Sequence, residues 1–124
     1  MPDSTRPNVV DIAAVVAARD FQAARSWYSR VLGREPDLEP IDDVAEWQIT
    51  DSSWLQLVTD ADRAGKSMVR FGVRDLVTQV ETLNDAGIAT SAPVVIADMV
   101  VVVDIPDPDG NEVSFVQELK AEPE

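Results

Sequence analysis

The stretch Asp107–Asn111, with the sequence Asp-Pro-Asp-Gly-Asn, followed directly by Glu112–Phe115, decides the fold of this 124-residue chain. Pro108 fixes φ at a value that suits a turn, and Gly110 permits a positive φ, so these residues predict a tight turn with a structural role. Apolar and polar residues alternate after the turn, which predicts a strand over Glu112–Glu118. The stretch therefore predicts the last hairpin of a sheet.

The first half of the chain predicts a strand, a helix and a hairpin. Val9–Ala17 is apolar and β-branched, which is typical of a buried strand. Asp20 is the expected N-cap and Gly33 the expected stop of a helix over Phe21–Leu32. Glu35–Glu46 then predicts an acidic edge strand with a loop. A hairpin is expected next, with strands Glu46–Thr50 and Ser53–Val58 joined by Asp51–Ser52.

The second half of the chain repeats this order. Ser67–Val73 predicts a strand, and a helix capped by Asp75 and stopped by Gly87 follows it. Asp75 lies 55 residues after Asp20, the N-cap of the first half. The three strands expected next are Ile88–Ile96, Met99–Ile105 and Glu112–Glu118. The sequence therefore predicts an α+β fold of two βαβββ modules, about residues 8–62 and 63–119, within a single domain of residues 1–124.

The net charge and composition of the chain indicate which kinds of partner are not expected and where in the cell the protein is expected. The net charge of −13 repels phosphate backbones and anionic lipids, so neither a nucleic acid nor a membrane is an expected partner. The chain has no Cys, no apolar leader at its N-terminus and no apolar run of membrane-spanning length. These observations predict a cytoplasmic, acidic protein.

Strand alternation divides the residues between two faces of each sheet. A two-residue turn at Asp51–Ser52 pairs Ile49 with Trp54 and Trp47 with Gln56, so these four residues are expected to form one patch. The run Val100–Val103 is apolar throughout, so alternation does not show which of its side chains point to which face. The face of Asp104 therefore stays undefined. The residues expected beneath the helices are Leu55, Leu57, Val69, Phe71, Val73, Val113 and Phe115.

Two pieces of sequence, Asp20–Gly33 with its Trp27–Tyr28 and Asp107–Phe115, resemble the vicinal oxygen chelate superfamily. This superfamily includes glyoxalase I, extradiol dioxygenases and bleomycin-resistance proteins. The resemblance covers about Val9–Gln117. It implies curved mixed sheets with helices on the convex face, and a homodimer with a cleft between the subunits.

The resemblance also locates the metal-ligand positions of the metal-dependent members. They correspond to Ala13, Gln56, Met68 and Ser114, of which Gln56 alone could bind a metal, through a weak neutral oxygen. The chain also has no His and no Cys, so neither a metal nor another cofactor is expected. An alternative is a displaced oxygen site that uses Asp11 and Glu112.

Small and apolar residues flanked by tryptophans predict an aromatic cleft for a small molecule. Trp47 and Trp54 could sandwich a flat ligand, or could simply fill the core. Arg70 could bind an acidic or carbonyl group, or could pair internally with Glu112 or Asp11. The candidate ligand-binding residues are Ala13, Trp47, Ile49, Trp54, Gln56, Met68, Arg70, Glu112 and Ser114.

These features lead to three hypotheses, of which a binding function is preferred to catalysis. The chain is closest in character to the metal-free bleomycin-resistance-like branch, which implies binding of an antibiotic or other aromatic natural product, with resistance by sequestration. The acidic segment Glu35–Glu46 would suit a cationic ligand. The alternative is a lyase, isomerase or dioxygenase-like enzyme with Asp11, Glu112 or Asp104 as the acid or base. The third is an interaction module without a small ligand.

Overall fold

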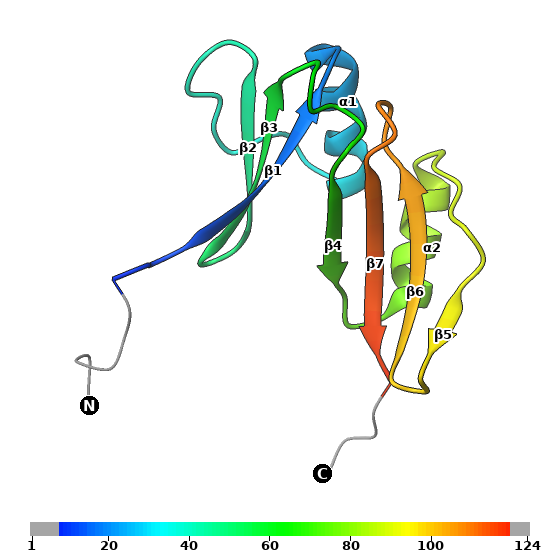
Figure 1. Cartoon of the computed structure of the whole chain (residues 1–124). Helices are drawn as coiled ribbons and strands as arrows, with labels where there is room; N and C mark the ends of the chain where they lie inside the picture. The colour runs from blue at the N-terminus through cyan, green and yellow to red at the C-terminus, as the bar shows by residue number, and fades with distance from the viewer. Residues whose placement is uncertain (1–7, 120–124) are drawn as a thin grey trace.

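The computed structural model describes residues 8–119, which form two helices and seven strands in two separate sheets (Figure 1). The first sheet has the strand order β1-β3-β2 and the second β4-β7-β6-β5. Both sheets mix parallel and antiparallel pairs, so the predicted α+β class is confirmed. In chain order the elements are β1 (Ile12–Ala18), α1 (Phe21–Leu32), β2 (Val44–Thr50), β3 (Ser53–Thr59), β4 (Met68–Gly72), α2 (Leu76–Asp85), β5 (Val94–Ile96), β6 (Val100–Pro106) and β7 (Glu112–Glu118).

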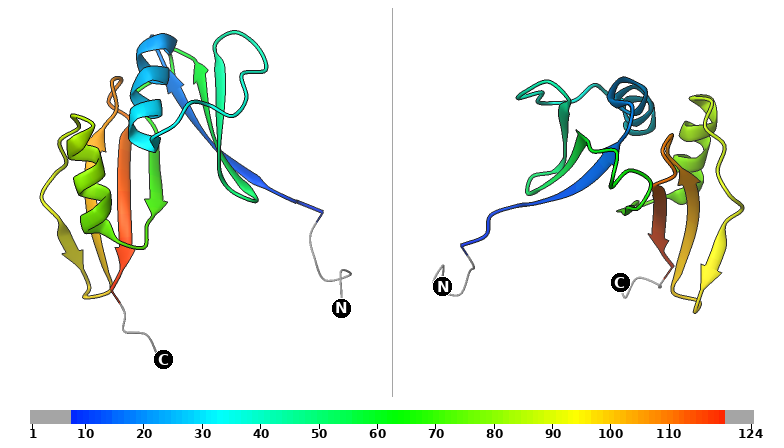
Figure 2. Two further views of the ribbon diagram at one scale, coloured as in Figure 1. Left: turned by 180° about the vertical axis from the view of Figure 1, so that it is seen from behind. Right: turned by 45° about the horizontal axis from the view of Figure 1, so that its top comes forward.

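Both helices begin at the predicted caps. The Asp20 carboxylate accepts from the backbone N–H of Ala23, and the Asp75 carboxylate accepts from that of Thr78. Gly33 ends α1 with a φ of 74°, a left-handed value that glycine adopts without steric cost. Each helix then lies across one face of its own sheet, α1 against β3 and α2 against β7 (Figure 2).

Within residues 8–119, one predicted strand does not form and another is shorter than expected, so the first module has the order βαββ and not βαβββ. The acidic segment 35–46 contributes an isolated bridge between Leu38 and Glu46, at the start of the hairpin. The strand predicted over Ile88–Ile96 is formed only at Val94–Ile96. Both segments follow a helix and contain prolines, and a proline lacks the N–H that a sheet ladder requires.

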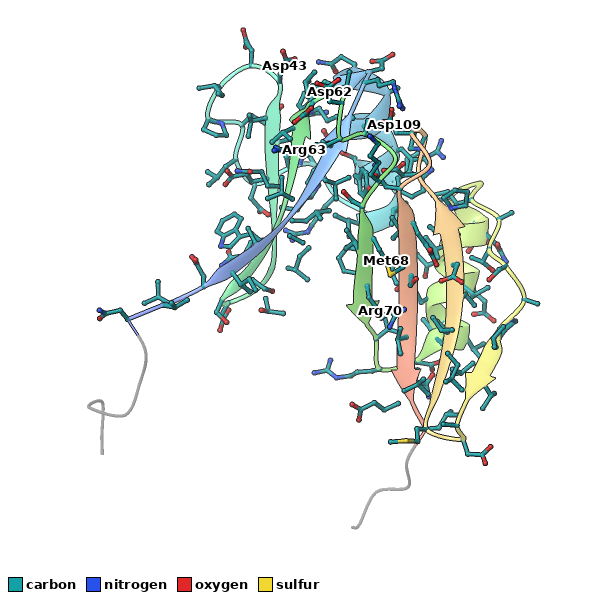
Figure 3. All side chains as sticks on the ribbon, viewed as in Figure 1. Asp43, Asp62, Arg63, Met68, Arg70 and Asp109 are labelled. Atoms are coloured by element: carbon teal, nitrogen blue, oxygen red, sulfur yellow. The ribbon has the colours of Figure 1, made fainter. Side chains whose placement is uncertain are left out.

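The closing turn, residues 107–111, joins the two sheets. The buried Asp107 carboxylate accepts from the Tyr28 hydroxyl on α1 at 2.7 Å. The buried Asn111 amide donates to the carbonyl of Ala17 on β1 at 3.0 Å, and its oxygen accepts from the backbone N–H of Ser67. Asp109 accepts from the backbone N–H of Arg19, close to the start of α1 (Figure 3). The turn therefore fixes β7 relative to the first half of the chain.

A single apolar core draws on both halves of the chain. Tyr28, Trp47 and Leu57 contribute from the first half, and Leu83 and Val113 from the second, all without solvent exposure. Phe71 and Phe115 stack on the helix side of the second sheet with ring centroids 5.4 Å apart. The residues predicted to lie beneath the helices belong to this core or pack against it.

Candidate functional site

Each sheet has one face covered by its helix. Its second face, here called the open face, is covered by no helix of residues 8–119. Paired residues on neighbouring strands share a face, so the strand registers identify its members. On the first sheet, Ala13 pairs with Trp54 and Val15 with Gln56. Ala13, Trp54 and Gln56 therefore lie together on the open face, as predicted.

The predicted register of the β2–β3 hairpin is wrong by one residue. The structure pairs Trp47 with Leu55 and Gln48 with Trp54, and a β-bulge interrupts the ladder between Gln48 and Thr50. Because successive side chains of a strand alternate between faces, this shift moves Trp47 to the helix face. Trp47 is fully buried, and its indole N–H donates to the carbonyl of Arg34 at 3.0 Å. Trp47 fills the core and is not a neighbour of Trp54 on the open face.

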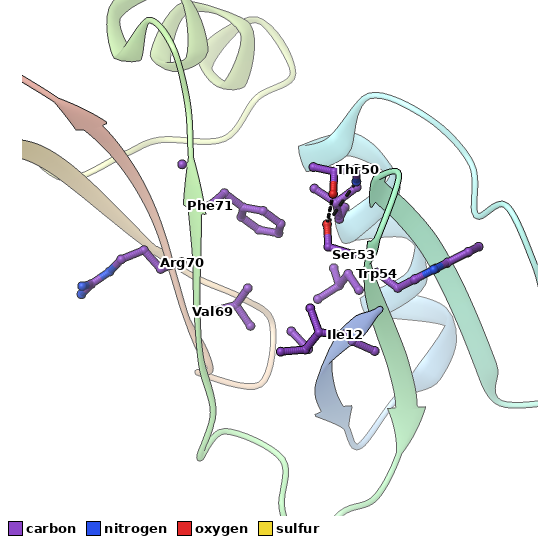
Figure 4. Close-up of a pocket in the computed structure, with 12 residues that line it drawn as sticks. Ile12, Thr50, Ser53, Trp54, Val69, Arg70 and Phe71 are labelled. Atoms are coloured by element: carbon purple, nitrogen blue, oxygen red, sulfur yellow. Dashed lines mark hydrogen bonds between the residues drawn. The ribbon is translucent and has the colours of Figure 1, made fainter. Parts of the chain in front are cut away.

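The bulge also changes the position of Ile49. This side chain packs against the core and lines an apolar groove of about 330 Å³ between the two sheets. Val69 and Phe71 approach the groove from β4, and Ile12 from β1 (Figure 4). Figure 4 shows the Trp54 and Arg70 side chains directed away from this groove. The groove therefore lies on the helix side of β4. Ala13, Trp54 and Arg70 also line it, but the Trp54 and Arg70 side chains turn away from it (Figure 4).

The open face of the second sheet carries a row of three polar residues across neighbouring strands. Arg70 on β4 pairs with Ser114 on β7, and Ser114 pairs with Asp104 on β6. The Ser114 hydroxyl donates to the Asp104 carboxylate at 2.5 Å, and Ser114 is fully buried. This register resolves the parity of β6 and brings Asp104 into the candidate site.

Arg70 is exposed beside Met68 along the edge strand β4 (Figure 3). Met68 pairs with Glu112, so both lie on the same open face as Arg70. Within residues 8–119, Arg70 forms no ion pair, neither with Glu112 nor with Asp11. Its guanidinium is therefore available to an acidic or carbonyl group from outside the chain.

An apolar surface next to this polar row, here called the apolar floor, was not predicted; it consists of Val94, Ile96, Val102 and Val116. Val94 and Ile96 on β5 are 54% and 50% exposed, and they lie on the open face with Val102. Val102 pairs in turn with Val116 on β7. The available signal was the five-residue closing turn: pairing Pro106 with Glu112 across it and counting back assigns every residue of β6 to a face.

The expected ligand positions do not fit a metal ion. Ala13 and Met68 offer no donor that suits a divalent cation, and the Ser114 hydroxyl already donates to Asp104. The Gln56 amide donates to Glu46 at 2.7 Å, which leaves its neutral oxygen as one weak ligand. In the described part of the chain, no group of three or more His, Cys, Asp or Glu side chains could hold a metal.

Neither helix, within residues 8–119, combines the length and the apolar character that a membrane span requires. Several exposed apolar residues lie at strand edges. Val10, Ile12 and Met68, at or next to the edge strands β1 and β4, are 81%, 71% and 61% exposed. An exposed strand edge of this kind can pair with another chain.

Comparison with protein-family models and with curated proteins found no match. Among solved structures, the chain is 32% identical to a glyoxalase/bleomycin resistance protein from Catenulispora acidiphila, with a TM-score of 0.82, over 87% of this chain and 97% of that one.

Two further structures share the fold. The antibiotic-binding protein TnmS3 from Streptomyces sp. CB03234 is 18% identical with a TM-score of 0.74, over 92% of this chain and 98% of that one. A lactoylglutathione lyase from Agrobacterium tumefaciens is 19% identical with a TM-score of 0.73, over 91% of this chain and 96% of that one.

Proposed function

This chain belongs to the glyoxalase/bleomycin resistance protein family, and from that premise we propose that it binds an aromatic small molecule of the antibiotic or natural-product class without a metal ion. One observation carries the proposal. The open faces combine an aromatic side chain, Trp54, and an apolar floor with a few polar groups, and the expected metal-ligand positions beside them hold Ala13 and Met68. Apolar surfaces with few, well-placed polar groups are typical of small-molecule sites.

The biological role we propose is resistance by sequestration. A protein that binds a toxic compound stoichiometrically lowers its free concentration and needs no reacting group. The name of TnmS3, an antibiotic-binding protein of the same fold, supports this class of ligand. Trp54 would stack on the ring system, and Arg70 would bind a carbonyl or acidic group of the ligand.

We also propose that the protein acts as a homodimer. β1 and β4 are edge strands with unpaired backbone groups and exposed apolar residues, so each chain has two strand edges that a second copy can cover. A two-fold dimer would bring Ala13 and Gln56 of one chain opposite Met68 and Ser114 of its partner, and would hold two equivalent clefts. Light scattering at tens of micromolar should give twice the monomer mass; a monomer would reject this arrangement.

Catalysis is the alternative, and one observation favours it. Of the three carboxylates considered as acid or base, Asp104 has a hydrogen-bonded partner, Ser114, on the open face. A lyase or isomerase could use such a carboxylate to move a proton. Turnover of a bound compound by the purified protein, lost in Asp104→Asn, would establish this alternative over sequestration.

The test of the binding proposal is native mass spectrometry with aromatic natural products and divalent metals, followed by tryptophan fluorescence. Trp54→Ala should weaken the binding of any hit by about 1–3 kcal/mol, the range for a stacked aromatic anchor. Trp27→Ala is the matched control, since Trp27 lies on α1 beside Tyr28 and away from the open face. Stoichiometric metal in protein purified without chelator would overturn the metal-free site. Equal effects of the two tryptophan variants would overturn the role of Trp54.

A further inference from the structure

The two halves of the chain carry the same kind of residue pair at the same place on the open face. On the first sheet, the Gln56 amide donates to the Glu46 carboxylate at 2.7 Å. On the second, the Ser114 hydroxyl donates to the Asp104 carboxylate at 2.5 Å. In each pair, the acid is on the strand before the last of its half and the neutral donor is on the last strand, directly opposite.

The strand registers show that these pairs are equivalent by the internal repeat. Gln56 pairs with Val15, and Ser114 pairs with Arg70. Val15 and Arg70 each precede the helix N-cap of their half by five residues. Glu46 and Asp104 therefore occupy equivalent positions in the two modules.

Neither carboxylate is neutralised by a Lys or Arg side chain in the part of the chain that the structure describes. In residues 8–119, Glu46 and Asp104 form no ion pair with Lys or Arg, and each accepts one side-chain hydrogen bond, from a neutral group. Both are partly buried. A neutral donor fixes the direction of a carboxylate but leaves its charge uncompensated and its second oxygen open to solvent or a ligand. A partly desolvated acid in this state gains most from a charge-assisted hydrogen bond.

We propose that Glu46 and Asp104 determine the ligand class of the site by binding protonated amino groups on an aromatic ligand. This inference rests on the proposed function and adds to it the charge of the ligand and the residues that select it. Gln56 and Ser114 are positioning residues, because they hold the two carboxylates toward the open face. The net charge of −13 raises the local concentration of cations and acts in the same direction.

The positive charge of Arg70 opposes the binding of a cation at Asp104 on the second sheet. It is on the opposite side of Ser114 from Asp104, and neighbouring strands lie about 5 Å apart. A cation bound to Asp104 is therefore repelled by the guanidinium two strands away. Arg70 and Asp104 should consequently have opposite effects on cation binding, which separates this proposal from a general effect of acidic charge.

The test uses two tricyclic probes of opposite charge, a cationic aminoacridine and an acridine carboxylate, with quenching of Trp54 as the readout. Asp104→Asn and Glu46→Gln should each weaken aminoacridine binding by about ten- to a hundredfold, the range for a hydrogen bond to a charged group. Arg70→Gln should strengthen aminoacridine binding and weaken that of the carboxylate. Glu81→Gln, an exposed site on α2, changes the net charge equally and should leave both probes unaffected.

Ser114→Ala separates positioning from folding. It should lower aminoacridine affinity while leaving acridine carboxylate affinity unchanged, whereas a merely unfolded fraction would lower both. Circular dichroism of each variant confirms that the compared proteins are folded. If Asp104→Asn and Glu46→Gln change aminoacridine binding no more than Glu81→Gln does, the inference is wrong even though aromatic binding stands. If the wild-type protein binds neither probe, the result counts against the inference and the proposed function together.

Discussion

The β2–β3 and β6–β7 hairpins occupy equivalent places in the two halves of the chain, yet only one has a regular register. The β6–β7 ladder runs without interruption from Val100 to Pro106. The β2–β3 ladder shifts between Gln48 and Thr50, although its turn is shorter. The closing turn of β6–β7 has side-chain bonds to α1, β1 and Ser67. The side-chain bonds at the Asp51–Ser52 turn are local, and its one non-local bond within residues 8–119 is from the backbone N–H of Ile12 to the Ser52 carbonyl. The regular register therefore goes with the turn that has more bonds to other elements, and not with the shorter turn.

The bulge has an energetic explanation in Trp47. A regular two-residue hairpin would direct this indole to the open face and leave a gap beneath α1. One extra residue on β2 redirects the whole side chain into the core, where it contacts Tyr28 with ring centroids 6.2 Å apart. Burying an aromatic side chain of this size contributes several kcal/mol, which exceeds the loss of one ladder pairing.

The largest expected effect comes from truncating the tryptophan on the core side of the irregular hairpin. Trp47→Ala should lower the free energy of unfolding by about 3–5 kcal/mol, since it leaves a cavity and an unpaired Arg34 carbonyl. Trp54→Ala on the open face is the control and should lower it by far less. Urea denaturation measures both. Equal losses in the two variants would mean that the bulge does not separate the tryptophans.

The comparison also shows what the sequence could predict. The caps Asp20 and Gly33 located α1 to the residue, because cap chemistry is local. Alternation placed Val113 and Phe115 beneath α2, because a regular strand keeps its parity. The bulge at Gln48–Thr50 could not be predicted, since it results from the space that the folded core offers to Trp47.

The candidate site was predictable to a similar extent. Residues on regular strands, such as Gln56, Arg70 and Ser114, lie on the face that alternation gave them. Asp104 and the apolar floor were missed because Val100–Val103 is apolar on both faces, so its parity depends on a register set across the closing turn. The exposure of β1 and β4 depends on how the two halves pack and has no local signal.

The anchoring of the regular hairpin can be broken at Asn111. Its side chain bonds to the Ala17 carbonyl, the Asp107 carboxylate and the Ser67 N–H, and it is fully buried. Asn111→Ala removes this partner from the Ala17 carbonyl and the Ser67 N–H, takes one of several bonds from Asp107, and should lower the free energy of unfolding by about 2–4 kcal/mol. Asn84→Ala, at an exposed position of α2, is the matched control. Thermal melts that show no difference between the two variants would remove the anchoring role of the closing turn.

Gly65, which lies outside both hairpins, packs closely against the closing turn. A Cβ on Gly65 would lie 2.6 Å from the carbonyl oxygen of Asp109 in the closing turn, and the φ of Gly65 is +82°. Gly65→Ala should therefore lower the free energy of unfolding by about 1–3 kcal/mol. Gly72→Ala serves as control, because no atom outside its neighbours lies within 4 Å of its Cβ position. If chemical denaturation shows that Gly65→Ala lowers the free energy of unfolding no more than Gly72→Ala does, close packing of Gly65 against the closing turn does not contribute to stability.

The smallest effect concerns Tyr28, the single tyrosine of the chain, which donates to Asp107 at 2.7 Å. Tyr28→Phe should lower the free energy of unfolding by about 1–1.5 kcal/mol at neutral pH.

The same contact makes stability depend on pH. Burial is the largest cause, followed by the hydrogen bond to Asp107 and its charge, and together they raise the pKa of the Tyr28 hydroxyl far above its usual value. An unfolded tyrosine ionises near pH 10, so the stabilisation is complete below that pH and declines above it, as the unfolded chain releases a proton that the folded chain keeps. The stability advantage of the wild type over Tyr28→Phe should therefore shrink above about pH 10. In an absorbance titration, tyrosinate should form together with the loss of the far-ultraviolet circular dichroism signal. Tyrosinate formed near pH 10 in a protein that is still folded would show that Asp107 does not hold the Tyr28 proton, and that the closing turn is tied to α1 by packing alone.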